Sequence, residues 1–185
     1  MCGRCLRMHL LTGGQRIEQL VRLRWADVRA DSITNYDTKG RPGQGGRTHT
    51  VPIIKAAARD LQSFERASDH VFSTTKGVKP ISGTTLSGWA ARVVGDAIEG
   101  FQLKRVRSGV ETLLAANRIS REIRGHVQSH GLTGIQARHY DGHDYMLEKR
   151  QALDVLAREL TGGAARPKAA MPRRKAGAAN PRVIR

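Results

Sequence analysis

The chain has 185 residues, 39% of them hydrophobic, which is enough for one ordinary core and too little for a second complete domain. Lys and Arg number 32 against 16 Asp and Glu, so the formal net charge is +16. This excess favours nucleic acid as the partner over a small-molecule substrate. There is no apolar run of about 18 residues and no secretory signal, so we expect a cytoplasmic protein with no membrane partner.

The first nine residues contain both cysteines of the chain. Cys2 and Cys5 form a C-x-x-C pair, which could be redox-active or, with His9, half of a zinc site. A structural zinc site usually needs four ligands, and no second cysteine pair completes it. We therefore expect two free thiols in a frayed terminus, and we take residues 1–9 as an atypical lead-in.

The first half of the chain predicts two helices and a β-hairpin. Apolar residues over 6–11 lead to a T-G-G turn at 12–14, and helical spacing returns over 17–25. Residues 31–37 and 47–53 alternate as strands do, and a Gly- and Pro-rich connection joins them. We expect a helix, a turn, a second helix and then a hairpin with a long basic tip.

The second half is predominantly helical in composition. Helices are expected over 54–66, 86–98, 103–116, 120–128 and 145–160, with a short helical turn before Tyr140. Residues 161–185 hold seven Lys or Arg, no acid and few large apolar side chains, so they cannot offset the entropy of folding. The predicted architecture is α+β, mostly α with one small antiparallel sheet, followed by a disordered basic tail.

Cleavage of a phosphodiester by a protein nucleophile needs a hydroxyl, cations that neutralise the developing charge, and an acid for the leaving oxygen. Arginine suits the cationic part because its planar fork binds two phosphate oxygens and keeps its charge. Lysine or histidine can supply the proton. These groups must come from separated positions of the chain.

Four segments resemble the tyrosine recombinase, or phage integrase, family in order and spacing. The segment LLTGGQRIEQLVRLRWADV looks like the T-G-x-R segment of the family, which places Arg16 as the first catalytic arginine. The segment YDTKGRPGQGGRTHTVPI resembles the β-hairpin of the family. Its lysine, which is Lys39 here, is thought to protonate the leaving oxygen.

The other two segments supply the second arginine, a histidine and the tyrosine. QLKRVRSGVETLLAANRISREIRGHVQSHG is similar to the H-x-x-R box, with Lys104 in place of the commoner histidine, Arg107 as the second clamp arginine and His130 as the later histidine. SHGLTGIQARHYDGHDYMLEKRQAL places Tyr140 ten residues after His130, as the nucleophile. Tyr145 is the alternative nucleophile, but the resemblance favours a packing role for it on the following helix.

The resemblance implies the catalytic domain of a tyrosine recombinase over residues 10–160, without the N-terminal core-binding domain. The implied function is site-specific DNA recombination or integration through a 3′-phosphotyrosine, as in phage integrases of mobile genetic elements. No cofactor and no metal are needed, and a homotetramer would act on two DNA sites. Further DNA contacts are expected from Arg41, Arg47, Arg105, His143, Arg173, Arg174 and Lys175.

The sequence also departs from the family. Gln19 stands where the family often has an acidic residue, and Ser108 and Gly109 replace the usual Arg-Thr after the second arginine. The missing clamp domain indicates a truncated reading frame or a clamp supplied by a partner. One alternative is therefore a catalytically inactive DNA-binding remnant of an integrase.

Two further alternatives come from other classes of protein. An unrelated basic nucleic-acid protein would leave the predicted site residues scattered. The histidine pairs His126/His130 and His139/His143 have the i, i+4 spacing of a zinc site. No H-E-x-x-H arrangement follows, and glycines interrupt the helix between the pairs, so this metal hypothesis is the weaker one.

Overall fold

The computed structural model describes residues 1–37, 47–130 and 143–162. Its elements are α1 (Cys2–Leu11), α2 (Ile17–Leu20), η1 (Trp25–Asp27), β1 (Ser32–Asp37), β2 (Arg47–Pro52), α3 (Lys55–Gln62), α4 (Gly83–Val94), η2 (Gly95–Ala97), α5 (Lys104–Ala116), α6 (Arg121–Gln128) and α8 (Met146–Leu160). β1 and β2 form an antiparallel hairpin in which Ile33 faces Val51. The predicted α+β class with one small antiparallel sheet is therefore confirmed.

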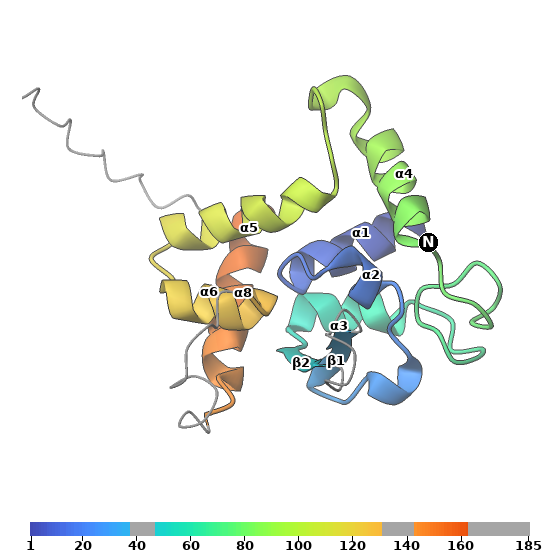
Figure 1. Cartoon of the computed structure of the whole chain (residues 1–185), viewed down its shortest axis with the longest axis horizontal. Coiled ribbons are helices and arrows are strands. Elements are labelled where there is room, and N and C mark those ends of the chain that lie inside the picture. Colours follow the sequence, from blue (N-terminus) through green and yellow to red (C-terminus); the bar gives the residue numbers. More distant parts are fainter. Residues whose placement is uncertain (38–46, 131–142, 163–185) are drawn as a thin grey trace, which may run out of the picture.

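The helices form two groups that share one core (Figure 1). In the first group α1 packs against α3 and α4, and α2 lies against β1, whereas α5, α6 and α8 pack together beside the hairpin. Leu20 and Val51 from the first group are buried in the same apolar cluster as Leu114, Val127 and Leu153 from the second. No helix in the described part of the chain is both long enough and apolar enough to span a membrane.

The N-terminal residues belong to this core. α1 begins at Cys2, and Cys5 and Met8 are fully buried. Burial raises the pKa of the Cys5 thiol to about 11, which makes it unreactive. Both cysteines are free, but the expectation of a frayed terminus is wrong. The apolar face of α1 explains the difference, because it packs against α3, α4 and α8.

The second helix is much shorter than its apolar spacing predicted. α2 ends at Leu20, although Leu23 is still buried. The backbone leaves the helix because it pairs with a distant segment: the Leu23 carbonyl accepts from the Val71 amide at 3.0 Å, and the Trp25 amide donates to Asp69 at 2.8 Å. The apolar spacing reflected burial, and long-range pairing decided the conformation.

α3 is also shorter than expected, and α4 begins and ends earlier. α3 ends at Gln62, where the Ser63 hydroxyl donates to the Asp60 carbonyl at 2.6 Å and ends the helix. α4 begins at Gly83, where the Ser82 side chain caps it by accepting from the Thr85 amide. At its other end the backbone turns at Gly95, which has a φ of +52°. α5, α6 and α8 begin and end within one residue of their predicted bounds, whereas α1 begins four residues before the predicted stretch 6–11.

Two cationic side chains attach α8 to the hairpin region. The Lys149 ammonium donates to the Thr50 carbonyl at 2.9 Å. The Arg150 guanidinium donates to the Ile53 carbonyl at 2.7 Å and to the Asp31 carbonyl at 3.1 Å. Lys149 is buried, and desolvation lowers its pKa. These bonds satisfy backbone acceptors and hold α8 beside β2.

Candidate active site

A cavity of about 870 Å³ opens between α2, the first turn of α4 and the start of α5. Its lining carries four cations and one carboxylate: Arg16, Arg22, Lys104, Arg107 and Glu18. Three of these cations are residues that the sequence predicted to be catalytic. The concentration of positive charge in a concave site suits a phosphate group or another polyanion.

The T-G-G turn brings the two predicted clamp arginines together. The Thr12 hydroxyl donates to the Met8 carbonyl at 2.7 Å and closes the last turn of α1. Gly13 and Gly14 follow with φ values of +87° and +67°, which disfavour any residue with a Cβ. A Cβ on Gly14 would lie 3.1 Å from the Arg107 Cα. The glycine therefore lets α5 approach the start of α2.

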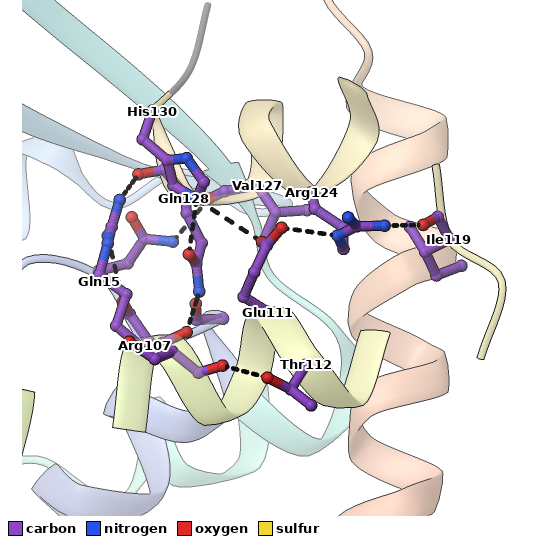
Figure 2. A network of polar contacts seen from close by, with 12 residues as sticks. Gln15, Arg107, Glu111, Thr112, Ile119, Arg124, Val127, Gln128 and His130 are labelled. Carbon is purple, nitrogen blue, oxygen red and sulfur yellow. Dashed lines mark hydrogen bonds and ion pairs between the residues drawn. The ribbon is translucent and has the colours of Figure 1, made fainter. Parts of the chain in front are cut away.

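Arg107 is held in place by backbone carbonyls. Its guanidinium donates to the Gly14 carbonyl at 3.2 Å and to the Gln128 carbonyl (Figure 2). Burial lowers the pKa of Arg107 to about 10, with a further contribution from the positive charge of Arg16, while Glu111 opposes the shift. Arg107 remains charged at neutral pH, so its positive charge lies close to that of Arg16. An anion bound between the two guanidinium groups would relieve their repulsion.

A buried amide connects three segments of the site. The Gln128 Nε2 donates to the Gly13 carbonyl and to the Arg107 carbonyl, both at 2.9 Å. The Gln128 Oε1 lies 2.9 Å from the His130 Nε2. The T-G-G turn, α5 and the end of α6 are thus joined by one side chain, which is buried at 1% exposure.

Buried neutral side chains lie next to the arginines, and two of them, His9 and Gln15, also line the cavity. Gln15 Nε2 donates to the Val127 carbonyl at 2.8 Å, and the same carbonyl lies 3.0 Å from the His49 Nε2. The His9 Nε2 lies 3.0 Å from the Gln15 carbonyl. Burial lowers the pKa of both histidines to about 4. Both are therefore uncharged at neutral pH and add no further positive charge to the site.

His130 lies between acceptors and cations. Its Nε2 lies 3.6 Å from the Glu111 carboxylate, which accepts from the Arg124 Nε at 2.7 Å (Figure 2). Burial lowers the pKa of His130, the charges of Arg107 and Arg16 lower it further, and Glu111 opposes them. The imidazole is therefore mainly neutral at pH 7 while no anion is bound.

Two of the three tyrosines have hydroxyls that donate to carboxylates. Tyr36 lines the cavity, but its hydroxyl donates to Asp27 at 2.9 Å. This hydrogen bond and the charge of Asp27 raise the pKa of Tyr36, so its phenolate forms less readily. The Tyr145 hydroxyl donates to Glu122 at 3.2 Å. Both hydroxyls are therefore engaged by carboxylates in this arrangement.

Two histidines of the zinc hypothesis, His126 and His143, contact the ring of Tyr145. His126 stacks on Tyr145 with ring centroids 3.8 Å apart, and His143 meets the same ring edge-on at 4.7 Å. His143 also pairs with Glu148 at 3.0 Å. In the part of the chain that the structure describes, no group of three potential metal ligands is found.

The structure brings some of the predicted site residues together and places others elsewhere. Arg16, Lys104 and Arg107 line one cavity, and His130 is linked to Arg107 through Gln128. Arg105 is exposed on α5, and Arg47 is the first residue of β2. The remaining predicted site residues lie outside the described residues: Lys39, Arg41, Tyr140, Arg173, Arg174 and Lys175.

Sequence reasoning missed the residues that support the arginines. Gln15, Gln128 and Glu111 have no special spacing, and nothing local marks them as part of a site. Arg22 could have been found, because it lies within the predicted helix 17–25 that begins directly after Arg16. Tyr36 was predicted to lie in a strand, and the structure adds that it lines the cavity.

The chain has the fold of a tyrosine recombinase catalytic domain, because its structure matches solved structures of one such enzyme, lambda integrase. The lambda integrase catalytic core matches with a TM-score of 0.55 at 18% identity, over 72% of this chain and 82% of the other. A lambda integrase dimer bound to a COC' core site matches with 0.55 at 19%, over 70% and 50%. A lambda integrase tetramer bound to a Holliday junction matches with 0.54 at 19%, over 72% and 43%.

The sequence itself matches no family model and no curated protein. The likeness to lambda integrase is one of fold, since the identities stay at 20% or below. This chain spans half or less of the lambda integrase chains in the dimer and in the Holliday junction complex.

Proposed function

We propose that this chain is the catalytic domain of a site-specific tyrosine recombinase that cleaves and rejoins duplex DNA. The observation that carries the proposal is the meeting of Arg16 and Arg107 in one cationic cavity of a tyrosine recombinase fold. These residues come from distant segments, and each was predicted separately from its motif. The proposal places the protein on DNA in the cytoplasm.

The cavity can bind the scissile phosphate. Arg107 is immobilised by two carbonyl bonds, so little side-chain entropy is lost when an anion binds. Arg16 adds a second charge from the N-terminus of α2, and Lys104 adds a third from the start of α5. Preorganised cations of this kind stabilise the extra negative charge of a pentavalent phosphate.

The nucleophile in this proposal is Tyr140. Its oxygen attacks the phosphorus and loses its proton to solvent, a 3′-phosphotyrosine bond forms, and the bond to the 5′ oxygen breaks. Lys39 gives its proton to that leaving oxygen. In the reverse direction a 5′ hydroxyl attacks the phosphotyrosine, so the bond energy is conserved and neither a cofactor nor a metal is required. The hydrogen bonds of Tyr36 and Tyr145 to carboxylates support this choice of tyrosine.

The proposed partners are double-stranded DNA and further copies of the same chain. The solved lambda integrase structures include a dimer bound to a core site and a tetramer bound to a Holliday junction. For this chain we propose a homotetramer on two DNA sites, because exchange between two duplexes needs four cleavages. The net charge of +16 supports the affinity for DNA.

The test is trapping of the covalent intermediate. The protein is incubated with nicked duplexes whose central sequence is randomised, so that it selects its own site, and adducts are resolved on a denaturing gel. We expect an adduct that Tyr140→Phe abolishes and that Tyr145→Phe, the matched control, retains. DNA binding without any adduct would support the inactive remnant instead. An adduct lost only in Tyr145→Phe would overturn the assignment of the nucleophile.

A further inference from the structure

We propose that Glu111 is a positioning residue for His130 and that, together with Gln128, it sets the tautomer and charge of this histidine. The structural part of this inference depends on the contacts between α5 and α6. Its consequence for catalysis rests on the proposed recombinase function. Glu111 was not predicted to belong to the site.

The tautomer of His130 follows from the hydrogen bonds of Gln128. The Gln128 Nε2 is directed at two carbonyls, those of Gly13 and Arg107, each at 2.9 Å, so this end of the amide must be the donor. The Oε1 end is therefore an acceptor, and it lies 2.9 Å from the His130 Nε2. The neutral imidazole must carry its proton on Nε2, which leaves the lone pair on Nδ1.

Glu111 supplies the negative charge beside that proton. One carboxylate oxygen accepts from the Arg124 Nε at 2.7 Å, and the other lies 3.6 Å from the His130 Nε2. The second oxygen is buried and has no hydrogen-bond partner among the described residues. It is therefore placed to stabilise a charged imidazole, as the acidic partner of a carboxylate–histidine pair does.

The other charged groups near His130 are cations. Arg107 on α5 and Arg16 before α2 both disfavour the imidazolium. Arg124 on α6 lies on the far side of Glu111 and pairs with it. Glu18 also lines the cavity, but it is exposed and its carboxylate is 3.9 Å from Arg22. Among the described residues, Glu111 is the carboxylate that offsets the cations at His130.

The proposed consequence concerns the reaction. When a DNA phosphate binds Arg16 and Arg107, their repulsion of the imidazolium is neutralised, and Glu111 then favours protonation of Nδ1. The charged His130 donates from Nε2 to Gln128 and from Nδ1 to a phosphate oxygen. The acidic residue that the family often places at position 19 is a glutamine here, and Glu111 supplies the carboxylate from another helix.

The first test needs no DNA and no activity. The imidazole nitrogens of the ¹⁵N-labelled full chain are titrated by NMR, which reports both tautomer and pKa. We expect His130 to be the Nε2–H tautomer and Glu111→Gln to lower its pKa. Arg124→Met, which removes the ion pair and keeps the carboxylate, should not lower it. Glu65→Gln removes an equal charge at an exposed position and serves as the control. Thermal unfolding checks that each variant is folded.

Two results would overturn the inference. An Nδ1–H tautomer would contradict the role of Gln128, and an equal fall of the pKa in Arg124→Met and Glu111→Gln would mean that the carboxylate acts only through its ion pair. Because both measurements use the free protein, they stand even if the chain proves unable to cleave DNA.

The second test uses the covalent adduct across pH. Glu111→Gln should form it roughly tenfold more slowly at neutral pH, the cost of about one charge-assisted contact. The fall of the rate at high pH should also begin at lower pH than in the unsubstituted chain. A uniform loss at every pH would indicate a structural role and contradict the positioning role.

Discussion

Replacement of Gly14 by alanine tests the close approach on which the site depends. The residue has a φ of +67°, which costs alanine about 1 kcal/mol or slightly more. The new Cβ would lie 3.1 Å from the Arg107 Cα, so α5 must move by a few tenths of an ångström, at a cost of about 1–3 kcal/mol. We expect a total loss of roughly 2–4 kcal/mol in the free energy of unfolding, because both terms act at one position.

The assay is urea or thermal unfolding followed by circular dichroism. A loss of that size lowers the melting temperature by roughly 5–15 °C in a chain of this length. Gly109→Ala is the matched control, because Gly109 lies inside α5 with open space around it and should become more stable by about 0.5–1 kcal/mol. Unchanged stability in Gly14→Ala, or a loss in Gly109→Ala, would refute the reasoning.

Two further predictions concern protons and salt. The usual histidine pKa of 6.5 falls to about 4 in His9 and His49 on folding, so the unfolded chain binds more protons between these values. The free energy of unfolding should therefore decrease as the pH is lowered, by about 2 kcal/mol per histidine at pH 5 relative to pH 7. His49→Gln should halve that fall in urea titrations, and a pH-independent stability would contradict the burial of both rings. Lys104→Ala should reduce the slope of log affinity against log salt for duplex DNA by about 1. An unchanged slope would mean that Lys104 does not contact phosphate.

Local sequence patterns predicted much of the fold. The alternation over residues 31–37 and 47–53 predicted the hairpin within one residue at the ends, because side chains of adjacent strand residues point to opposite faces. α5 and α6 were predicted equally well from their helical composition, and the structure adds that the Ser120 side chain caps α6. Such signals lie within a few residues of one another and need no knowledge of distant contacts.

The same reasoning failed where distant segments compete with the local preference. The residues after Leu20 have helical spacing, yet the backbone at Leu23 and Trp25 pairs with residues 69–71. Cys5 was expected at a frayed end because a short N-terminal segment carries little information about what covers it. The core that buries it is built mainly from residues far along the chain.

The sequence by itself determined the basic charge, the elements and the separate motifs that point to Arg16, Lys104, Arg107 and His130. Only the tertiary structure decided that three of these cations share a cavity and that buried glutamines support them. The physical reason is that a buried amide such as Gln128 needs two acceptors and one donor, which come from three segments whose positions depend on the packing of the T-G-G turn against α5 and α6. Glu111 became part of the site for the same reason, since its partners on α6 come close only in the folded chain.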